Sequence, residues 1–223
     1  MANPSAARID GRKARSTATR QTVVDALLAL LTDGELQPTA PRIAARAGVS
    51  LRSVFQHFPD LETLFAAAAD RQTARLRAMA HPLPTDGPLH ARLSAFVAQR
   101  AGLLEALTPV RRAAVLMEPF SAEIARRLSG ARAAGRSEVA RVFAPELAAC
   151  TPAERREVVA ALAVASSWST WEPLRAHHGL SVEQARKVMT RLVAALLAPA
   201  AGARTTRPAA RHRTAPTRRA TAH

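Results

Sequence analysis

The segment that most constrains the fold of this chain is a turn, Ala47-Gly48-Val49-Ser50, set between two short runs of mixed apolar and polar residues. Gly48 stands where a sharply reversing chain needs a residue that adopts positive φ at low cost. Ser50 is a good N-cap, because its side-chain oxygen can accept a hydrogen bond from an orphan backbone N–H. Two short helices joined in this way form a helix-turn-helix, whose second helix enters the major groove of DNA.

The second helix of this motif is expected over residues 51–56, with Val54 facing inward. Arg52 can donate two hydrogen bonds to a guanine, Gln56 can read an adenine, and Ser53 can reach a base or a phosphate. A phosphate contact or plain solvent exposure stays open for Arg52. The side chains expected near the outside of this helix are Leu51, Arg52, Ser53, Phe55 and Gln56.

This region resembles the N-terminal DNA-binding domain of TetR-family transcriptional regulators. The likeness covers roughly residues 18–66 at the level of motif, and the length and helical character of the remainder also fit. It implies that Thr39, Phe55 and His57 grip phosphates. The residues that carry the likeness, at the spacing found in that family, are Thr39, Ile43-Ala44, Ala47-Gly48-Val49-Ser50, Ser53, Phe55 and His57-Phe58.

The sequence departs from the family pattern at two positions. Phe55 stands where the family more often has a tyrosine, so a phenolic hydrogen bond to phosphate is missing and Phe55 can simply pack. Leu61 stands where many members have a lysine that contacts phosphate. Arg42 can compensate, as can a basic N-terminal arm able to reach the minor groove. For His57, a packed or capping role without DNA contact stays open. The arm carries Arg12, Lys13 and Arg15.

The charge of the chain favours an anionic partner. The formal net charge is +15 over 223 residues, and the last 25 residues carry six arginines and no acid. Cys150 is the only cysteine, so no intrachain disulfide can form, which suits a reducing cytoplasm. We expect Cys150 to be a small buried hydrophobe rather than a redox sensor. The N-terminus has no apolar segment typical of a signal peptide, and a cytoplasmic location is expected.

Periodicity and punctuation along the chain predict an all-α protein. Pro109 and Pro199 are each expected to end a helix. The predicted divisions are a disordered basic arm over residues 1–18, a helix-turn-helix domain over 19–66, a helical effector-binding and dimerisation domain over 67–198, and a disordered basic tail over 199–223. Helices are expected over residues 19–33, 61–80, 89–107, 110–117, 121–129 (or on to 149), 151–177 and 181–197.

The larger half resembles the TetR family only in layout, in which these helices enclose a small-molecule pocket and the last two pair with a second subunit. Each pocket candidate can instead be a core residue, and the dimer candidates can instead cover the core of one protomer. The pocket candidates are Phe96, Arg100, Met117, Phe120, Trp168 and Trp171. The dimer candidates are Ala161, Ala165, Met189, Leu192, Val193 and Leu196.

These features together predict a ligand-responsive regulator, by resemblance a repressor, that binds a palindromic operator as a homodimer. The expected partners are double-stranded DNA, an unknown small-molecule effector and a second copy, with no membrane. One alternative is a ligand-blind architectural DNA-binding protein, which the basic tail favours. An enzyme is a weaker alternative, because the sequence has no Gly-rich phosphate loop, no nucleophile elbow and no metal-binding cluster. No cofactor or metal is expected.

Overall fold

The computed structural model describes residues 4–202, and it describes side chains over residues 13–198. Every regular element in this range is helical, which confirms the all-α prediction. The elements are α1 (Pro4–Thr32), α2 (Ala40–Ala47), α3 (Leu51–His57), α4 (Leu61–Met79), α5 (Leu89–Met117), the 3-10 turn η1 (Glu118–Phe120), α6 (Ala122–Val142), α7 (Ala144–Leu147), α8 (Pro152–Ala165), α9 (Trp168–Ala176) and α10 (Val182–Gly202).

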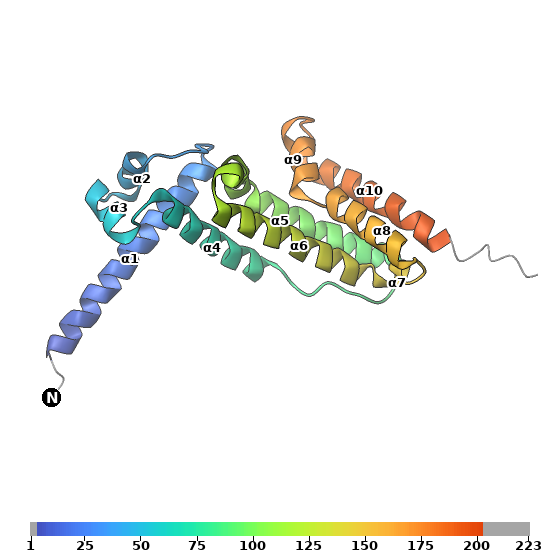
Figure 1. Cartoon of the computed structure of the whole chain (residues 1–223), viewed down its shortest axis with the longest axis horizontal. Coiled ribbons are helices and arrows are strands. Elements are labelled where there is room, and N and C mark those ends of the chain that lie inside the picture. Colours follow the sequence, from blue (N-terminus) through green and yellow to red (C-terminus); the bar gives the residue numbers. More distant parts are fainter. Residues whose placement is uncertain (1–3, 203–223) are drawn as a thin grey trace, which may run out of the picture.

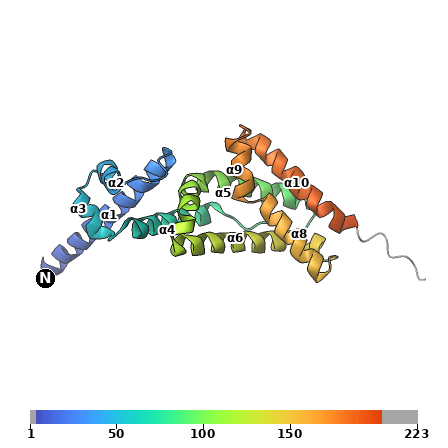
Figure 2. The same ribbon diagram turned by 45° about the horizontal axis from the view of Figure 1, so that its top comes forward.

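The molecule is elongated, with its two ends built from different parts of the chain. Helices α2 and α3 lie beside α1 at one end, and the long helices α5, α6, α8 and α10 pack together toward the other (Figures 1 and 2). We call α1 to α4 the head and α5 to α10 the body. Helix α4 runs from the head to the loop over residues 80–88, and that loop leads into α5.

The head has its own hydrophobic core, but α5 of the body completes it. Ala113 of α5 is 1% exposed within this cluster, and Val110 packs against it. The head core therefore depends on residues far from the helix-turn-helix in sequence. Its remaining buried members are Val23, Val24, Ala26, Leu27, Leu30, Leu31, Ile43, Ala44, Val54, Phe58, Leu64 and Ala68.

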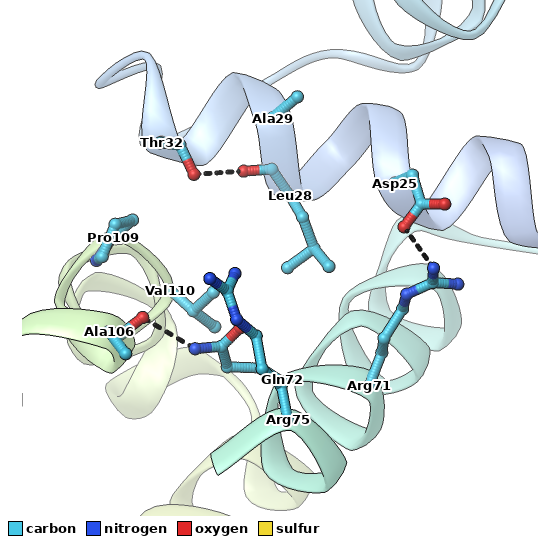
Figure 3. Close-up of a pocket in the computed structure, with 10 residues that line it drawn as sticks. All are labelled: Asp25, Leu28, Ala29, Thr32, Arg71, Gln72, Arg75, Ala106, Pro109 and Val110. Atoms are coloured by element: carbon cyan, nitrogen blue, oxygen red, sulfur yellow. Dashed lines mark hydrogen bonds and ion pairs between the residues drawn. The ribbon is translucent and has the colours of Figure 1, made fainter. Parts of the chain in front are cut away.

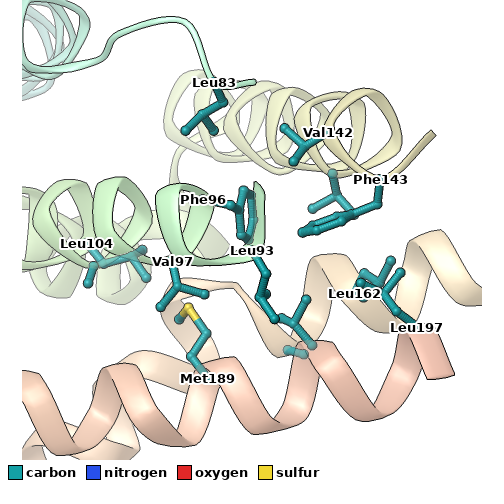
Figure 4. Packing of buried hydrophobic residues seen from close by; sticks show 14 of the residues in the cluster. Leu83, Leu93, Phe96, Val97, Leu104, Val142, Phe143, Leu162, Met189 and Leu197 are labelled. Carbon is teal, nitrogen blue, oxygen red and sulfur yellow. The ribbon is translucent and has the colours of Figure 1, made fainter. Parts of the chain in front are cut away.

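The body core lies between α5, α6, α8, α9 and α10 (Figure 4). Phe96 and Phe143 meet edge to face, with ring centroids 5.2 Å apart and planes at 73°, a favoured aromatic geometry. Arg92 and Glu146 form a buried ion pair, and Arg92 also donates to the Val142 carbonyl at 2.7 Å. The shared hydrogen bonds offset the cost of removing both charges from water.

Helix α5 does not end at Pro109, contrary to the sequence-based expectation. Pro109 lies inside a continuous helix, although it removes the N–H that would bond the Glu105 carbonyl. The Thr108 hydroxyl donates to the Leu104 carbonyl at 2.7 Å, and Gln72 of α4 donates to the Ala106 carbonyl at 2.7 Å. Side chains thus form hydrogen bonds with backbone groups around the proline. Residues of α5 also pack into both hydrophobic cores, which keeps the helix continuous.

The helix expected over residues 151–177 is instead divided at a serine pair. Ser166 ends α8 and donates its hydroxyl to the Leu162 carbonyl at 2.8 Å, while Ser167 is the N-cap residue of α9. Serine side chains compete with the helical ladder in this way. The predicted capping box that begins α8 is present, because the Glu154 N–H donates to Thr151 Oγ1 and the Thr151 N–H to Glu154.

The first and last helices extend beyond their expected limits. Helix α1 begins at Pro4, so the segment predicted as a disordered arm is helical from that residue. Alanines and arginines favour helix, and proline suits the first helical position. Helix α10 continues through Pro199 to Gly202, and Leu197, in the turn before the proline, is 0% exposed in the body core. The rest of the predicted basic tail lies outside the described residues.

Candidate nucleic-acid interface

Local hydrogen bonds determine the turn between α2 and α3. Gly48 has φ 66° and ψ 30°, the left-handed conformation that glycine adopts without a steric penalty. The Gly48 N–H donates to the Ala45 carbonyl at 3.2 Å, and the Val49 N–H donates to the Ala44 carbonyl at 3.1 Å. This pair of bonds is the Schellman motif. The turn predicted from sequence is therefore present in its expected form.

The side chain of Ser50 begins α3. Its Oγ accepts a hydrogen bond from the Ser53 N–H at 3.1 Å, as expected for an N-cap. The Ser50 oxygen therefore serves as the acceptor that caps the helix. Its O–H group can still donate a hydrogen bond to a DNA phosphate. Ser53 is half-buried.

Helix α3 has one buried face and one exposed face. Val54 is 1% exposed in the head core, and this contact fixes the rotation of α3 about its axis. The opposite side chains recur at helical spacing and form an outward face on one side of the helix. The members of this outward face are Leu51, Arg52, Phe55 and Gln56, all exposed.

Arg52 differs from the other arginines near the turn. Arg42 pairs with Glu35 at 3.2 Å, and Arg46 pairs with Asp33 at 2.9 Å. Arg52 forms no ion pair with any residue that the structure describes. Its guanidinium donors are consequently available to a binding partner. Arg42 would instead have to leave the Glu35 carboxylate before it could bind a phosphate. Such exposed pairs are worth at most about 1 kcal/mol, so the exchange is inexpensive.

The remaining phosphate candidates surround α3. Thr39 is the N-cap residue of α2, but its exposed side chain makes no capping hydrogen bond. Its hydroxyl can therefore reach a phosphate at the positive end of that helix. His57 is the last residue of α3 and is half-buried. Phe55 is 45% exposed, so its ring is not packed away in the head core.

The predicted basic arm forms the free end of α1, which extends past α2 and α3 (Figure 1). Lys13 and Arg15 are exposed, and the side chain of Arg12 lies outside the described residues. Arg20 was not predicted to take part in this region, but its guanidinium carbon lies 4.6 Å from the centre of the Phe58 ring. This cation–π contact places a cation beside the end of α3.

Helix α4 begins beside the motif with an acidic cap rather than a cation. Asp60 accepts a hydrogen bond from the Thr63 N–H at 2.7 Å, and this bond holds the pKa of the carboxyl below its usual value. Leu61 is half-buried and packs against the head core. Glu62 accepts a hydrogen bond from the Ser121 hydroxyl, which ties α4 to α6.

The predicted pocket residues differ in their burial. Phe96 and Trp171 are buried in the body core, whereas Phe120 is 88% exposed on η1 and Met117 is half-buried beside it. The Trp168 indole donates to Thr108 Oγ1 at 3.1 Å. None of these residues lines the cavity at the junction of head and body or the shallower cavity between α5 and α10.

Arg100, the sixth pocket candidate, is held in the body. It pairs with Glu138, and its guanidinium carbon lies 5.0 Å from the centre of the Phe96 ring. Burial lowers its pKa, and the charge of Glu138 opposes this effect. Arg100 thus has partners within the protein, which the sequence could not reveal.

The predicted dimer residues divide between the core and the surface. Met189 and Val193 are 0% exposed and Ala165 is 8% exposed, so they cover the core of one protomer. Leu192 is 40% exposed, and Ala161 and Leu196 are half-buried. Val164 was not among the predicted dimer residues, but it is 65% exposed on α8. Its position in an alanine-rich run was the one sequence feature that could have indicated its exposure.

The comparisons with known proteins establish the fold. A transcriptional regulator from Rhodococcus sp. Rha1 has a similar structure, with a TM-score of 0.66, 19% sequence identity, and 82% of this chain and 97% of that chain covered. A protein from Pseudomonas aeruginosa PAO1, provisionally assigned as a transcriptional regulator, gives a TM-score of 0.60 and 21% identity, with 82% and 92% covered. No family model and no curated protein matches the sequence.

Two further findings concern the described residues alone. None of their helices is both long and apolar enough to span a membrane. No group of three or more His, Cys, Asp or Glu side chains among them is placed to bind a metal ion.

Proposed function

We propose that this protein is a sequence-specific DNA-binding transcriptional regulator of the TetR type, with α3 as its recognition helix. The observation that carries the proposal is the outward face of α3, which is held in position by the Schellman turn at Gly48, the Ser50 cap and buried Val54. The structural likeness to regulators from Rhodococcus and Pseudomonas supports it through the fold.

Within this proposal the contacts fall into two classes. Arg52 and Gln56 read base edges in the major groove, because both side chains are exposed on one face of α3. Thr39, Arg42 and His57 grip the phosphates that flank the groove, and Lys13 and Arg15 follow the backbone or the minor groove farther along. Phosphate contacts set the register, while the base contacts determine which sequence is preferred.

The proposed DNA-binding form is a homodimer. Helices α8 and α10 pack together in the body, and they carry the exposed apolar residues Val164 and Leu192. A symmetric contact through these helices would cover both residues. Two recognition helices related by a two-fold axis require a palindromic operator with half-sites about one helical turn apart.

The proposed response to a small molecule works through α4. This helix is bonded to α6 through Glu62 and to α5 through Gln72, so a displacement in the body moves the head with it. A change in the separation of the two recognition helices weakens binding to a palindrome of fixed spacing. Repression, relieved by the ligand, is the mode that we propose.

The test is selection of DNA from a random library by the purified full-length protein, followed by footprinting of the enriched sequence. We expect a palindrome, protected over both half-sites, with at least about a thousandfold preference over random DNA at physiological salt. Equal affinity for enriched and random DNA would contradict the proposal and favour an architectural DNA-binding protein. Sedimentation at micromolar concentration tests the dimer independently.

A further inference from the structure

A cavity of about 370 Å³ lies where α1, α4 and α5 meet (Figure 3). It is not part of the DNA-reading surface, and none of the residues predicted to form a pocket lines it. Its walls come from both the head and the body, and its volume is in the range of small-molecule sites, about 300 to 1,000 Å³. A molecule bound there would contact both parts at once.

One side of this junction cavity carries more positive than negative charge. Arg71 pairs with Asp25 at 2.9 Å, which accounts for the one acid in the lining. Arg75, one turn farther along α4, forms no ion pair with any residue that the structure describes. Figure 3 shows its guanidinium group directed toward the space between α4 and α5. A planar guanidinium with free donors is suited to a carboxylate, which it can bind through two parallel hydrogen bonds.

Apolar side chains form another part of the wall, which also includes the polar residues Thr32 and Gln72. Leu28 of α1 and Val110 of α5 face the cavity, and they offer a surface for a hydrocarbon group. Gln72 is 7% exposed and donates to the Ala106 carbonyl at 2.7 Å, one turn before Pro109. This hydrogen bond joins α4 to α5 at the cavity.

We propose that the junction cavity binds a small organic carboxylate with an apolar body, whose carboxylate pairs with Arg75 and whose hydrocarbon part packs against Leu28 and Val110. The consequence for DNA rests on the function proposed above: a bound carboxylate fixes α1 against α5, and so changes the affinity of the head for its operator. The two binding events are then coupled reciprocally.

The first experiment measures ligand binding to the full-length protein without DNA. Octanoate is the probe, with 1-octanol as its neutral counterpart and acetate as the carboxylate without an apolar body, each titrated by calorimetry at constant ionic strength. We expect saturable binding of octanoate and weaker binding of the other two. Arg75→Gln should weaken octanoate binding about tenfold or more, the loss expected for a charge-assisted hydrogen bond, and should leave octanol unchanged.

The matched control is Arg77→Gln, the same change on the same helix at an exposed arginine that does not line the cavity. It should bind octanoate like the unmodified protein. The proposal is overturned if octanoate shows no saturable binding at millimolar concentration, or if the two variants bind it equally. Circular dichroism of both variants verifies that they are folded.

The second experiment measures affinity for the enriched palindrome with and without saturating octanoate. A change of several-fold in the unmodified protein, lost in Arg75→Gln, supports the coupling, and an unchanged affinity overturns it. The two proposals fail separately: absence of sequence-specific DNA binding without octanoate removes the proposed function, whereas absence of octanoate binding removes only the junction site.

Discussion

Replacement of glycine by alanine is expected to have opposite effects on stability at Gly48 and at Gly102. Both positions have open space where a Cβ would stand, with no atom within 4 Å, so neither alanine would clash. The difference is the backbone: Gly48 has φ +66°, whereas Gly102 lies inside α5 and is not among the positive-φ glycines of the described chain. The sign of the effect on stability therefore depends on conformation alone.

The magnitudes follow from the two conformations. An L-residue held in the left-handed region destabilises the folded state by about 1–2 kcal/mol. Alanine also lowers the conformational entropy of the unfolded chain, which offsets about 0.4–1 kcal/mol of this loss. Gly48→Ala should therefore destabilise the protein by about 1 kcal/mol. Gly102→Ala should stabilise it by about 0.5–1 kcal/mol, because alanine is the better helix former.

Denaturant unfolding followed by circular dichroism measures both free energies, and thermal melting gives a second readout. For a chain of this size each kcal/mol corresponds to about 2–4 °C in the melting midpoint. The two midpoints should shift in opposite directions from that of the unmodified protein. A higher midpoint for Gly48→Ala would refute the assignment of the left-handed turn at Gly48, and a lower midpoint for Gly102→Ala would refute the reasoning for the helical position.

Three further predictions concern DNA, assembly and pH. Arg52→Ala should cost about 1–3 kcal/mol on the preferred palindrome and relax specificity at one position, whereas Arg42→Ala should weaken binding to all sequences and flatten the salt dependence; fluorescence anisotropy on preferred and random DNA separates them, and equal losses for Arg52→Ala on both would count against base reading. Val164→Glu should shift the protein toward monomer in sedimentation, since it would place like charges in a symmetric contact; an unchanged dimer would exclude α8 from the interface. The lowered pKa of Asp60, caused by the Thr63 N–H, means that its contribution to stability is complete above the usual carboxyl pKa and is lost as the pH falls through the lowered one. Asp60→Asn keeps a capping oxygen and should remove that part of the acid dependence in unfolding experiments at a series of pH values; an identical acid profile would argue against the cap.

Elements specified by local chemistry were predictable from sequence. The turn at Gly48, the cap at Ser50 and the capping box at Thr151 each depend on residues within a few positions of one another. The end of α1 at Thr32, followed by Gly34 with φ 92°, is of the same kind. For such features the side chain and the backbone conformation that it favours appear together in the sequence.

Features that depend on tertiary packing were not predictable in the same way. Pro109 would end an isolated helix, but contacts on both sides of it keep α5 continuous. The hydrogen bond from the Trp168 indole to Thr108 joins residues 60 positions apart, so no local pattern could indicate it. The junction cavity joins residues of α1, α4 and α5, and no spacing within one segment could indicate that Arg75 faces Leu28 across it.

Helix α5 belongs to both hydrophobic cores, since Phe96 and Leu104 lie in the body core while Val110 and Ala113 contribute to the head core. A protein fragment cut after α4 would keep the helix-turn-helix but expose the apolar surface that Ala113 covers. The head consequently cannot be transferred to another protein by itself. Without the end of α5, its exposed apolar surface would make it prone to aggregation. A chimera that transfers the helix-turn-helix to another protein should also carry the residues of α5 after Pro109.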